Sequence, residues 1–136
     1  MNKKVTPETE NLLWSAAQAA AALAYAPYSD FHVGAALLTS EGEVVTGCNV
    51  ENASYGLTNC AERTAVFRAI AEGKLSRGVG IEAIAVVHRD GQSCTPCGAC
   101  RQVLYEFGPN AVVIYEYEGE RRQTTISALL PENFQP

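Results

Sequence analysis

The order of strand-like and helix-like segments in the middle of the chain restricts the fold more than any other sequence feature. Residues 81–88 form a nearly continuous apolar run rich in branched side chains, which is typical of a buried strand. Residues 60–72 have apolar positions at helical spacing, and Gly73 follows them as a helix-ending residue. Residues 97–107 form a second helical segment, and residues 111–117 form another buried strand. This alternation predicts an α/β fold with helices on both faces of one sheet.

Further strands are expected at both edges of this sheet. Residues 33–40 and 43–50 are separated by a Glu-Gly turn and predict a β-hairpin. A short connection after Tyr117 leads to a strand near residues 122–126, and it leaves no room for a crossover, so these last two strands should be antiparallel. We therefore predict a three-layer α/β/α arrangement around a five-stranded mixed sheet, in one domain covering residues 1–136.

A helix is predicted near the start of the chain. Thr6-Pro7-Glu8 combines a capping hydroxyl, a proline suited to the first helical position and an acid in the first turn. We expect this helix to continue to about Tyr25 and to end before Pro27. Its apolar part, residues 14–26, is short and alanine-rich, so we predict no membrane span. The polar first residues predict no secretion signal.

Charge and cysteine content restrict the function. The chain of 136 residues has 10 basic and 15 acidic side chains and a net charge of −5, which argues against a nucleic-acid partner. Its 5 cysteines are an odd number. Three of them are crowded between Cys94 and Cys100, and nothing predicts export. We therefore expect a cytoplasmic protein whose reduced thiols bind metal rather than form disulfides.

Three cysteines are placed where they can share one metal ion. Cys60 opens one predicted helix, while Cys97 and Cys100 open the other. If both helices follow parallel strands, their first residues meet at the same edge of the sheet. Helix N-termini stabilise thiolates, and Cys97 and Cys100 share one helix face. Zinc prefers such ligands, and three of them leave its fourth position open.

Two residues beside Cys60 complete the predicted centre. Glu62 can reach the open position from the side, take a proton from metal-bound water and deliver it to a substrate nitrogen. Arg63 is expected to donate to a cysteine sulfur, which would offset the negative charge of three thiolates. A surface ion pair is the alternative for Arg63.

These motifs resemble a known family. Cys60-Ala61-Glu62 and Pro96–Cys100 are similar to the signature of zinc nucleoside and nucleobase deaminases. The segments Tyr25–Leu37, Gly47–Ala65 and Ala128–Phe134 resemble the small cytidine deaminases. The resemblance covers nearly the whole chain from Tyr25. It implies a cytoplasmic enzyme of pyrimidine salvage that hydrolyses cytidine and deoxycytidine to the uridine products and ammonia.

The resemblance also implies roles for individual residues. It places one Zn²⁺ per subunit on Cys60, Cys97 and Cys100, with Glu62 as proton carrier. Asn49 and Glu51 would bind the ribose hydroxyls. Phe31 would pack against the pyrimidine, and the Ala61 N–H would donate to the base carbonyl. It implies a homotetramer with shared active sites, in which Tyr55 and Phe134 reach toward a neighbouring subunit's pocket. Packing in the core or at an interface is the alternative for the aromatic residues.

Other interpretations of the motifs remain open. A blasticidin-S-type or other modified-nucleoside aminohydrolase would use the same chemistry, although the segment Asn49–Asn52 favours an ordinary ribose. A structural zinc or iron–sulfur module is the alternative from another class, and Cys94 would then be a fourth ligand. We expect Cys94 and Cys48 to be buried thiols, and His32 and His88 to be ordinary strand-end residues.

Overall fold

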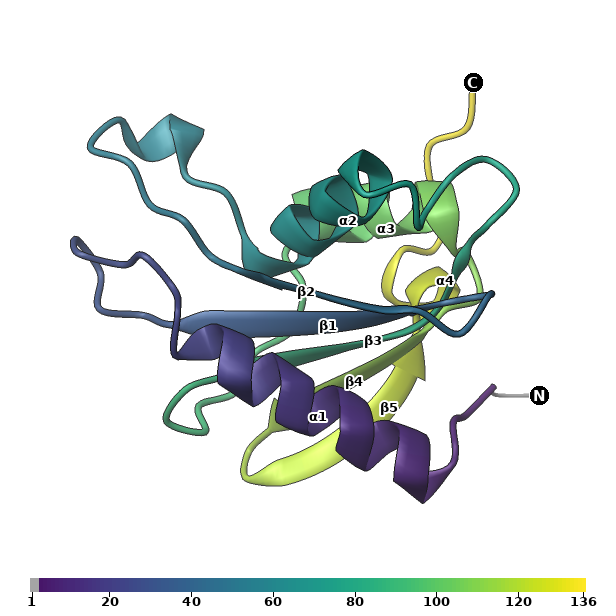
Figure 1. Ribbon diagram of the computed structural model, residues 1–136, viewed down its shortest axis with the longest axis horizontal. Coiled ribbons are helices and arrows are strands. Elements are labelled where there is room, and N and C mark those ends of the chain that lie inside the picture. The colour runs from purple at the N-terminus through teal and green to yellow at the C-terminus, as the bar shows by residue number, and fades with distance from the viewer. Residues whose placement is uncertain (1–2) are drawn as a thin grey trace.

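The computed structural model describes residues 3–136 and contains one mixed sheet flanked by helices (Figure 1). Its strands are β1 (Val33–Thr39), β2 (Val44–Cys48), β3 (Ile81–His88), β4 (Val112–Tyr117) and β5 (Glu120–Thr125). Their order in the sheet is β2-β1-β3-β4-β5. Strand β1 is antiparallel to both β2 and β3, β4 is parallel to β3, and β5 is antiparallel to β4. The predicted five-stranded mixed sheet, its first hairpin and the antiparallel last pair are confirmed.

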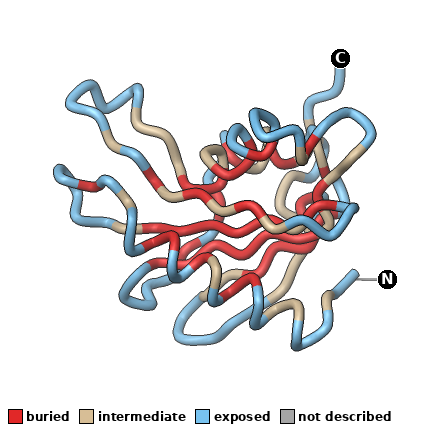
Figure 2. The backbone as a smooth tube through the Cα atoms, viewed as in Figure 1, coloured by how far each residue is buried: buried red, intermediate tan, exposed pale blue. Residues whose placement is uncertain are grey.

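Helices cover both faces of this sheet, as predicted. The helices are α1 (Pro7–Ala21), α2 (Ala61–Ala71), α3 (Gly98–Phe107) and α4 (Ile126–Leu129), with a 3-10 turn η1 (Tyr55–Leu57). Helix α1 lies on one face, and α2 and α3 lie side by side on the other (Figure 1). Alternate residues of β3 pack on opposite faces of the sheet. Ile84 and Val86 face α2 and α3, while Ala83, Ala85 and Val87 face α1. Strands β1 and β3 are consequently buried along most of their length, whereas the edge strand β5 has no buried residue (Figure 2).

The ends of some elements differ from the predicted ones. Helix α1 begins at Pro7, where the Thr6 hydroxyl accepts a hydrogen bond from Thr9 N at 3.2 Å, but it ends at Ala21 rather than near Tyr25. Tyr25 instead donates its N–H to Asn49 O at 3.0 Å and bridges to Val50. Long-range pairing therefore ends the helix before local sequence would.

The C-terminal strand also differs from its prediction. Strand β5 covers Glu120–Thr125 rather than residues 122–126, because a tight turn with Glu118 and Gly119 at positive φ begins it earlier. Ile126 opens the short helix α4, which Thr125 caps through a hydrogen bond from Ala128 N at 3.3 Å. Within the part of the chain that the structure describes, no helix combines the length and apolar character of a membrane span.

The connections of the sheet place two helix starts at one edge. Strands β2 and β3 run in the same direction because both are antiparallel to β1, and β3 and β4 are directly paired and parallel. Helix α2 follows β2 and helix α3 follows β3, so each begins beyond the carboxyl end of a parallel strand. Residues that cap α2 and α3 are thereby brought together.

Candidate metal centre and substrate cavity

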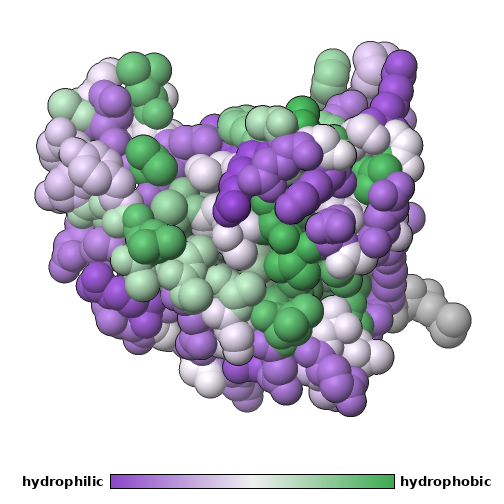
Figure 3. Space-filling view, in the orientation of Figure 1, coloured by the Kyte–Doolittle hydropathy of each residue, from purple (hydrophilic) through white to green (hydrophobic). Residues whose placement is uncertain are grey.

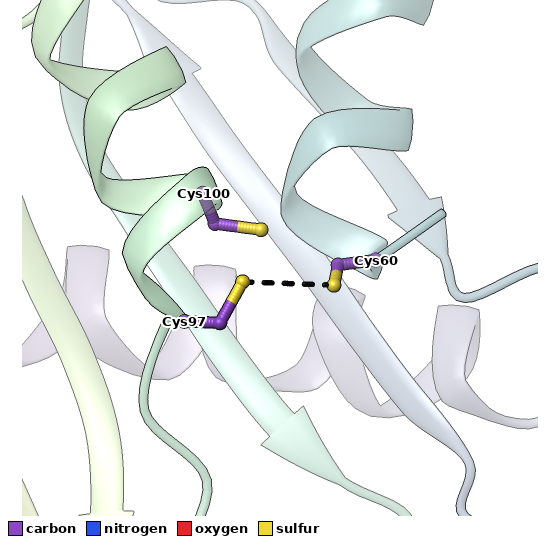
Figure 4. Close-up of side chains that lie close together, drawn as sticks. All are labelled: Cys60, Cys97 and Cys100. Atoms are coloured by element: carbon purple, nitrogen blue, oxygen red, sulfur yellow. Dashed lines mark hydrogen bonds between the residues drawn. The ribbon is translucent and has the colours of Figure 1, made fainter. Parts of the chain in front are cut away.

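The three predicted thiol ligands converge. Cys60 is the N-cap residue of α2, Cys97 is the N-cap residue of α3, and Cys100 lies in the first turn of α3. All three sulfur atoms lie within 4.8 Å of one another, and Cys60 Sγ is 3.9 Å from Cys97 Sγ. The side chains point toward a common centre between the two helices (Figure 4). The convergence predicted from the two helix starts is confirmed.

The spacing of the sulfur atoms fits one tetrahedral zinc ion. A Zn–S bond of about 2.3 Å with tetrahedral angles places two sulfur ligands about 3.8 Å apart. The separation of 3.9 Å between Cys60 and Cys97 matches this value. Cys100 is buried, Cys60 is half-buried and Cys97 is exposed, so the ion would be held at the rim of the core rather than inside it. Three soft ligands in this arrangement would leave one position for a further ligand.

The thiols interact with one another and with a neighbouring guanidinium. A hydrogen bond from the Cys100 thiol, together with Arg63, lowers the pKa of Cys60 to about 5. The same bond raises the pKa of Cys100, which is the donor. Arg63 Nη2 donates to Cys60 Sγ at 3.3 Å, which raises the pKa of the guanidinium. Arg63 therefore faces sulfur, as predicted, and Cys60 is a thiolate at neutral pH even before a metal deprotonates its neighbours.

Glu62 is a buried acid next to the thiols. Only 4% of its surface is exposed, although it lies in the first turn of α2, where glutamate is usually solvated. Burial, with a smaller contribution from the charge of Cys60, raises its pKa to about 7. At neutral pH the carboxyl group therefore exists in both protonation states, which suits an acid–base role.

A cavity of about 180 Å³ opens beside this group. It is lined by residues from β1 and the segment before it, the segment after β2, the start of α2 and the loop before α3: Phe31, Val33, Asn49, Thr58, Asn59, Cys60, Ala61, Glu62, Cys94, Thr95 and Cys97. The predicted proton carrier, two of the thiols, Phe31, Asn49 and Ala61 thus share one space. A second hollow of about 380 Å³ continues from Thr58 past Glu51 and Tyr55.

Asn49 and Glu51 lie in the extended segment after β2, and both are held by protein partners. Asn49 Oδ1 accepts from Val33 N at 2.8 Å, and its Nδ2 donates to Phe31 O at 2.7 Å. Glu51 Oε1 accepts from Tyr28 N at 2.9 Å and Ser29 N at 3.1 Å, and Oε2 accepts from the Ser29 hydroxyl. These bonds, that of the Ser29 hydroxyl first, lower the pKa of Glu51, so it is ionised.

The two aromatic residues expected to reach another subunit are separate from the thiol-lined cavity. Tyr55 is 75% exposed and lines the second hollow. Phe134 is 74% exposed and lies with Phe67 and Ile70 over a different hollow between α2 and α3. Within one chain, the structure does not bring Phe134 to the cavity.

Cys94 is a buried thiol and His88 ends β3, both as predicted, but the sequence did not indicate their contacts at the site. Cys94 lines the cavity, but it lies outside the three-thiol cluster found among the described residues, and burial raises its pKa to about 12. His88 was expected to be an ordinary strand-end residue, yet its ring packs on Phe31 with centroids 4.3 Å apart. No spacing in the sequence indicates that contact, because it depends on how β1 and β3 pair.

Comparison with known proteins agrees with this geometry. Residues 7–116 match the family profile described as the cytidine and deoxycytidylate deaminase zinc-binding region. A cytidine deaminase of Halalkalibacterium halodurans is 51% identical over 113 residues, which are 82% of this chain and 83% of that protein. The blasticidin-S deaminase of Bacillus cereus is 32% identical over 107 residues, 74% of each chain.

Solved structures give the same result. The crystal structure of cytidine deaminase from Burkholderia pseudomallei has 51% sequence identity and a TM-score of 0.82, covering 96% of this chain and all of that one. That of the Mycobacterium tuberculosis cytidine deaminase has 45% identity and a TM-score of 0.80, covering 93% of this chain and 97% of the other. Sequence, fold and thiol geometry lead to one conclusion: the chain belongs to the cytidine and deoxycytidylate deaminase family.

Proposed function

We propose that the protein is a zinc-dependent cytidine deaminase, which hydrolyses cytidine and deoxycytidine to uridine and deoxyuridine with release of ammonia. The observation that carries this proposal is the position of Glu62, a buried carboxyl group that lines the same cavity as Cys60 and Cys97, two of the three converging thiols. A structural zinc site has no need of a buried acid beside an accessible cavity. The whole chain, residues 1–136, would act as one catalytic domain.

Cys60, Cys97 and Cys100 would hold the zinc ion. When bound, zinc supplies Lewis acidity, which lowers the pKa of a water molecule at its free position. Glu62 would take one proton from the attacking water and deliver it to N3 of the base, and it would then carry the second proton of that water to the departing amine. The net change is a C4–N bond replaced by a C4–O bond, with ammonia released. A pKa near 7 allows Glu62 to accept and return protons at neutral pH.

The remaining cavity residues would bind the nucleoside. Phe31 would pack on the pyrimidine, and the Ala61 N–H at the start of α2 would donate to the base carbonyl. Asn49 keeps one N–H and one oxygen lone pair beyond its two protein bonds, and the carboxylate of Glu51 also keeps free lone pairs. Their existing bonds would hold them in place for the ribose hydroxyls, so binding need not order them.

We also propose a cytoplasmic homotetramer with shared active sites and a role in pyrimidine salvage. Tyr55 and Phe134 are strongly exposed on one chain, and Phe67 and Ile70 widen the apolar surface around Phe134. Hydrophobic surface is also visible at the upper left of the molecule, where the loop with η1 projects (Figure 3). Exposed apolar patches of this kind are typical of interfaces. A small nucleoside, rather than nucleic acid or membrane, would be the partner of the cavity.

The proposal is tested by zinc analysis together with an absorbance assay on cytidine, deoxycytidine, cytosine and CMP. We expect one zinc per chain and turnover of the two nucleosides. Glu62→Gln, which keeps the size of the side chain, and Glu62→Ala should both retain zinc and lose about 10²- to 10⁴-fold in turnover. Normal turnover in either zinc-loaded variant would exclude the proton-carrier role.

Blasticidin S provides the competing substrate. The relationship to a blasticidin-S deaminase at 32% identity makes a modified-nucleoside aminohydrolase the second candidate. Turnover of blasticidin S above that of cytidine would favour this second activity. Stoichiometric zinc without turnover of any of these compounds would favour a structural metal site.

A further inference from the structure

His88 is a buried polar residue that the proposed chemistry does not use. It is the last residue of β3, and only 3% of its surface is exposed. Its Nδ1 atom accepts a hydrogen bond from Asp90 N at 3.1 Å. In the neutral ring this bond places the proton on Nε2, and it fixes how the imidazole plane is turned. The side chain is therefore held in one orientation by the backbone that follows it.

The fixed imidazole packs on Phe31. The two ring centroids lie 4.3 Å apart, with an angle of 48° between the planes. Phe31 is 38% exposed and lines the thiol-lined cavity, so buried His88 lies on its interior side. A centroid distance this short is contact between aromatic rings, and such pairs favour defined relative orientations.

The backbone of Phe31 is anchored independently of this contact. Phe31 N donates to the Ser29 hydroxyl at 3.0 Å, and Phe31 O accepts from Asn49 Nδ2 at 2.7 Å. These bonds fix where the side chain begins, but they leave its rotamer free. The ring of a half-exposed phenylalanine at a cavity wall has solvent on one side, so a neighbour on the other side decides which rotamer is populated.

The pairing of β1 and β3 brings the two rings together. Val33 is the register partner of His88, and Arg89 N donates to His32 O at 2.9 Å just beyond the strand ends. Phe31 therefore sits next to the last paired residues of β3. A shift of this register would separate Phe31 from His88 and would also move the cavity wall.

We propose that His88 is a positioning residue, which holds the Phe31 ring in the orientation that the ligand of the thiol-lined cavity meets. The placement of Phe31 follows from the geometry alone, whereas identifying the ligand as a pyrimidine nucleoside rests on the proposed function. A wall of this kind contacts the base equally before and during reaction. Its loss should raise KM and leave kcat nearly unchanged.

Two variants separate the ring of His88 from its hydrogen bond. His88→Phe keeps an aromatic ring but removes the acceptor of the hydrogen bond from Asp90 N. Because Asp90 is exposed, its N–H can donate to water instead. His88→Gln keeps a polar side chain and removes the ring. We expect His88→Gln to raise the KM for cytidine about 2- to 10-fold, with kcat within about twofold of the unmodified protein. We expect KM of His88→Phe to stay within about twofold.

A double-mutant cycle with Phe31→Leu tests whether His88 acts through Phe31. His88→Gln should add no further change in KM once the phenylalanine ring is absent. Multiplicative effects of the two substitutions on KM would overturn the proposal, and so would an unchanged KM in His88→Gln. A general loss of stability would lower the melting temperature without producing this coupling.

Ring resonances of selectively labelled phenylalanine give a readout that does not depend on turnover. In the zinc-loaded protein without substrate, His88→Gln should move and broaden the Phe31 signals, assigned through Phe31→Leu, while His88→Phe keeps them sharp. Unchanged Phe31 signals in His88→Gln would refute the positioning role. If the unmodified protein fails to deaminate cytidine, the proposed function fails, and these spectra still decide whether His88 places Phe31.

Discussion

Replacing Gly47 by alanine is expected to destabilise the protein and to weaken zinc binding together. Gly47 lies in β2 directly beneath the first turns of α2. A Cβ atom at this position would overlap Ala65 N and lie 2.7 Å from Ala61 O, and both are backbone atoms of the helix. No side chain can rotate away to relieve the overlap, so α2 itself must move. Cys60 caps that helix and must move with it.

The required movement is large compared with what a zinc site tolerates. Ordinary van der Waals contact begins at about 3.4 Å, so the contact of 2.7 Å with Ala61 O alone requires a displacement of about 0.7 Å, and the closer contact with Ala65 N requires more. Zinc–ligand distances are held within about 0.2 Å. We therefore expect zinc affinity to fall by about tenfold or more, which is about 1.4 kcal/mol. Overpacking of the core costs about 3 kcal/mol at the upper end, a fall of roughly 10 °C in melting temperature for a chain of this size.

A glycine on the opposite face of the sheet supplies the matched control. Alanine at Gly34 would overlap Ala17 O and Ala21 N of α1, which carries no residue of the thiol cluster. Gly34→Ala should be destabilised at least as much, while its folded fraction keeps normal zinc affinity. Gly56→Ala, with no atom within 4 Å of the added carbon, should change neither quantity. Competition with a chromophoric chelator at a temperature where each variant is folded measures the affinity. Normal affinity in Gly47→Ala would refute the coupling of β2 packing to the metal site.

Three further predictions test single contacts. Cys94→Ser should keep one zinc per chain by elemental analysis, since Cys94 lies outside the thiol cluster, and loss of the metal would make it a ligand. Arg63→Gln removes a donor to Cys60 Sγ, so the Cys60 pKa rises from about 5 and protons compete better with the metal. Zinc should then be released at a higher pH than from the unmodified protein, measured by stepwise acidification with a zinc indicator, and release at the same pH would contradict the reasoning. Thr6→Ala removes the cap bond to Thr9 N and should cost about 1 kcal/mol in chemical denaturation without changing turnover.

The metal centre could be predicted from sequence because its geometry follows from local patterns and one topological rule. The apolar run at residues 81–88 and the helical spacing after Cys60 and Cys97 each specify an element without reference to the rest of the chain. Parallel strands followed by helices then bring the two helix starts to the same edge. This inference requires only that β2 and β3 run in the same direction. It therefore holds without knowledge of the strand order, in which β1 lies between them.

The parts of the site that sequence did not predict depend on pairing between distant segments. The amide of Asn49 bonds to the backbone of Phe31 and Val33, an arrangement that requires β1 beside β2 in a specific register. The contact of His88 with Phe31 requires the register of β1 with β3. Helix α1 ends at Ala21 for a similar reason, because the following residues pair with the segment after β2. Local propensity carries no information about these partners.

The charges around Glu62 explain why Arg63 follows it directly. Zinc with three thiolates has a formal charge of −1. The positive charge of Arg63 brings the total to zero, and ionisation of Glu62 returns it to −1. Arg63 lowers the pKa of Glu62, whereas burial and the charge of Cys60 raise it. The site made of zinc, the three thiolates, Arg63 and Glu62 is therefore formally neutral when Glu62 is protonated. When Glu62 is ionised, the site carries one negative charge near the N-terminus of α2, where the helix dipole stabilises it. Without the guanidinium the ionised site would carry −2, and the pKa of Glu62 would be higher. Arg63 thus favours the ionised form of Glu62 as well as the thiolate form of Cys60, which it contacts.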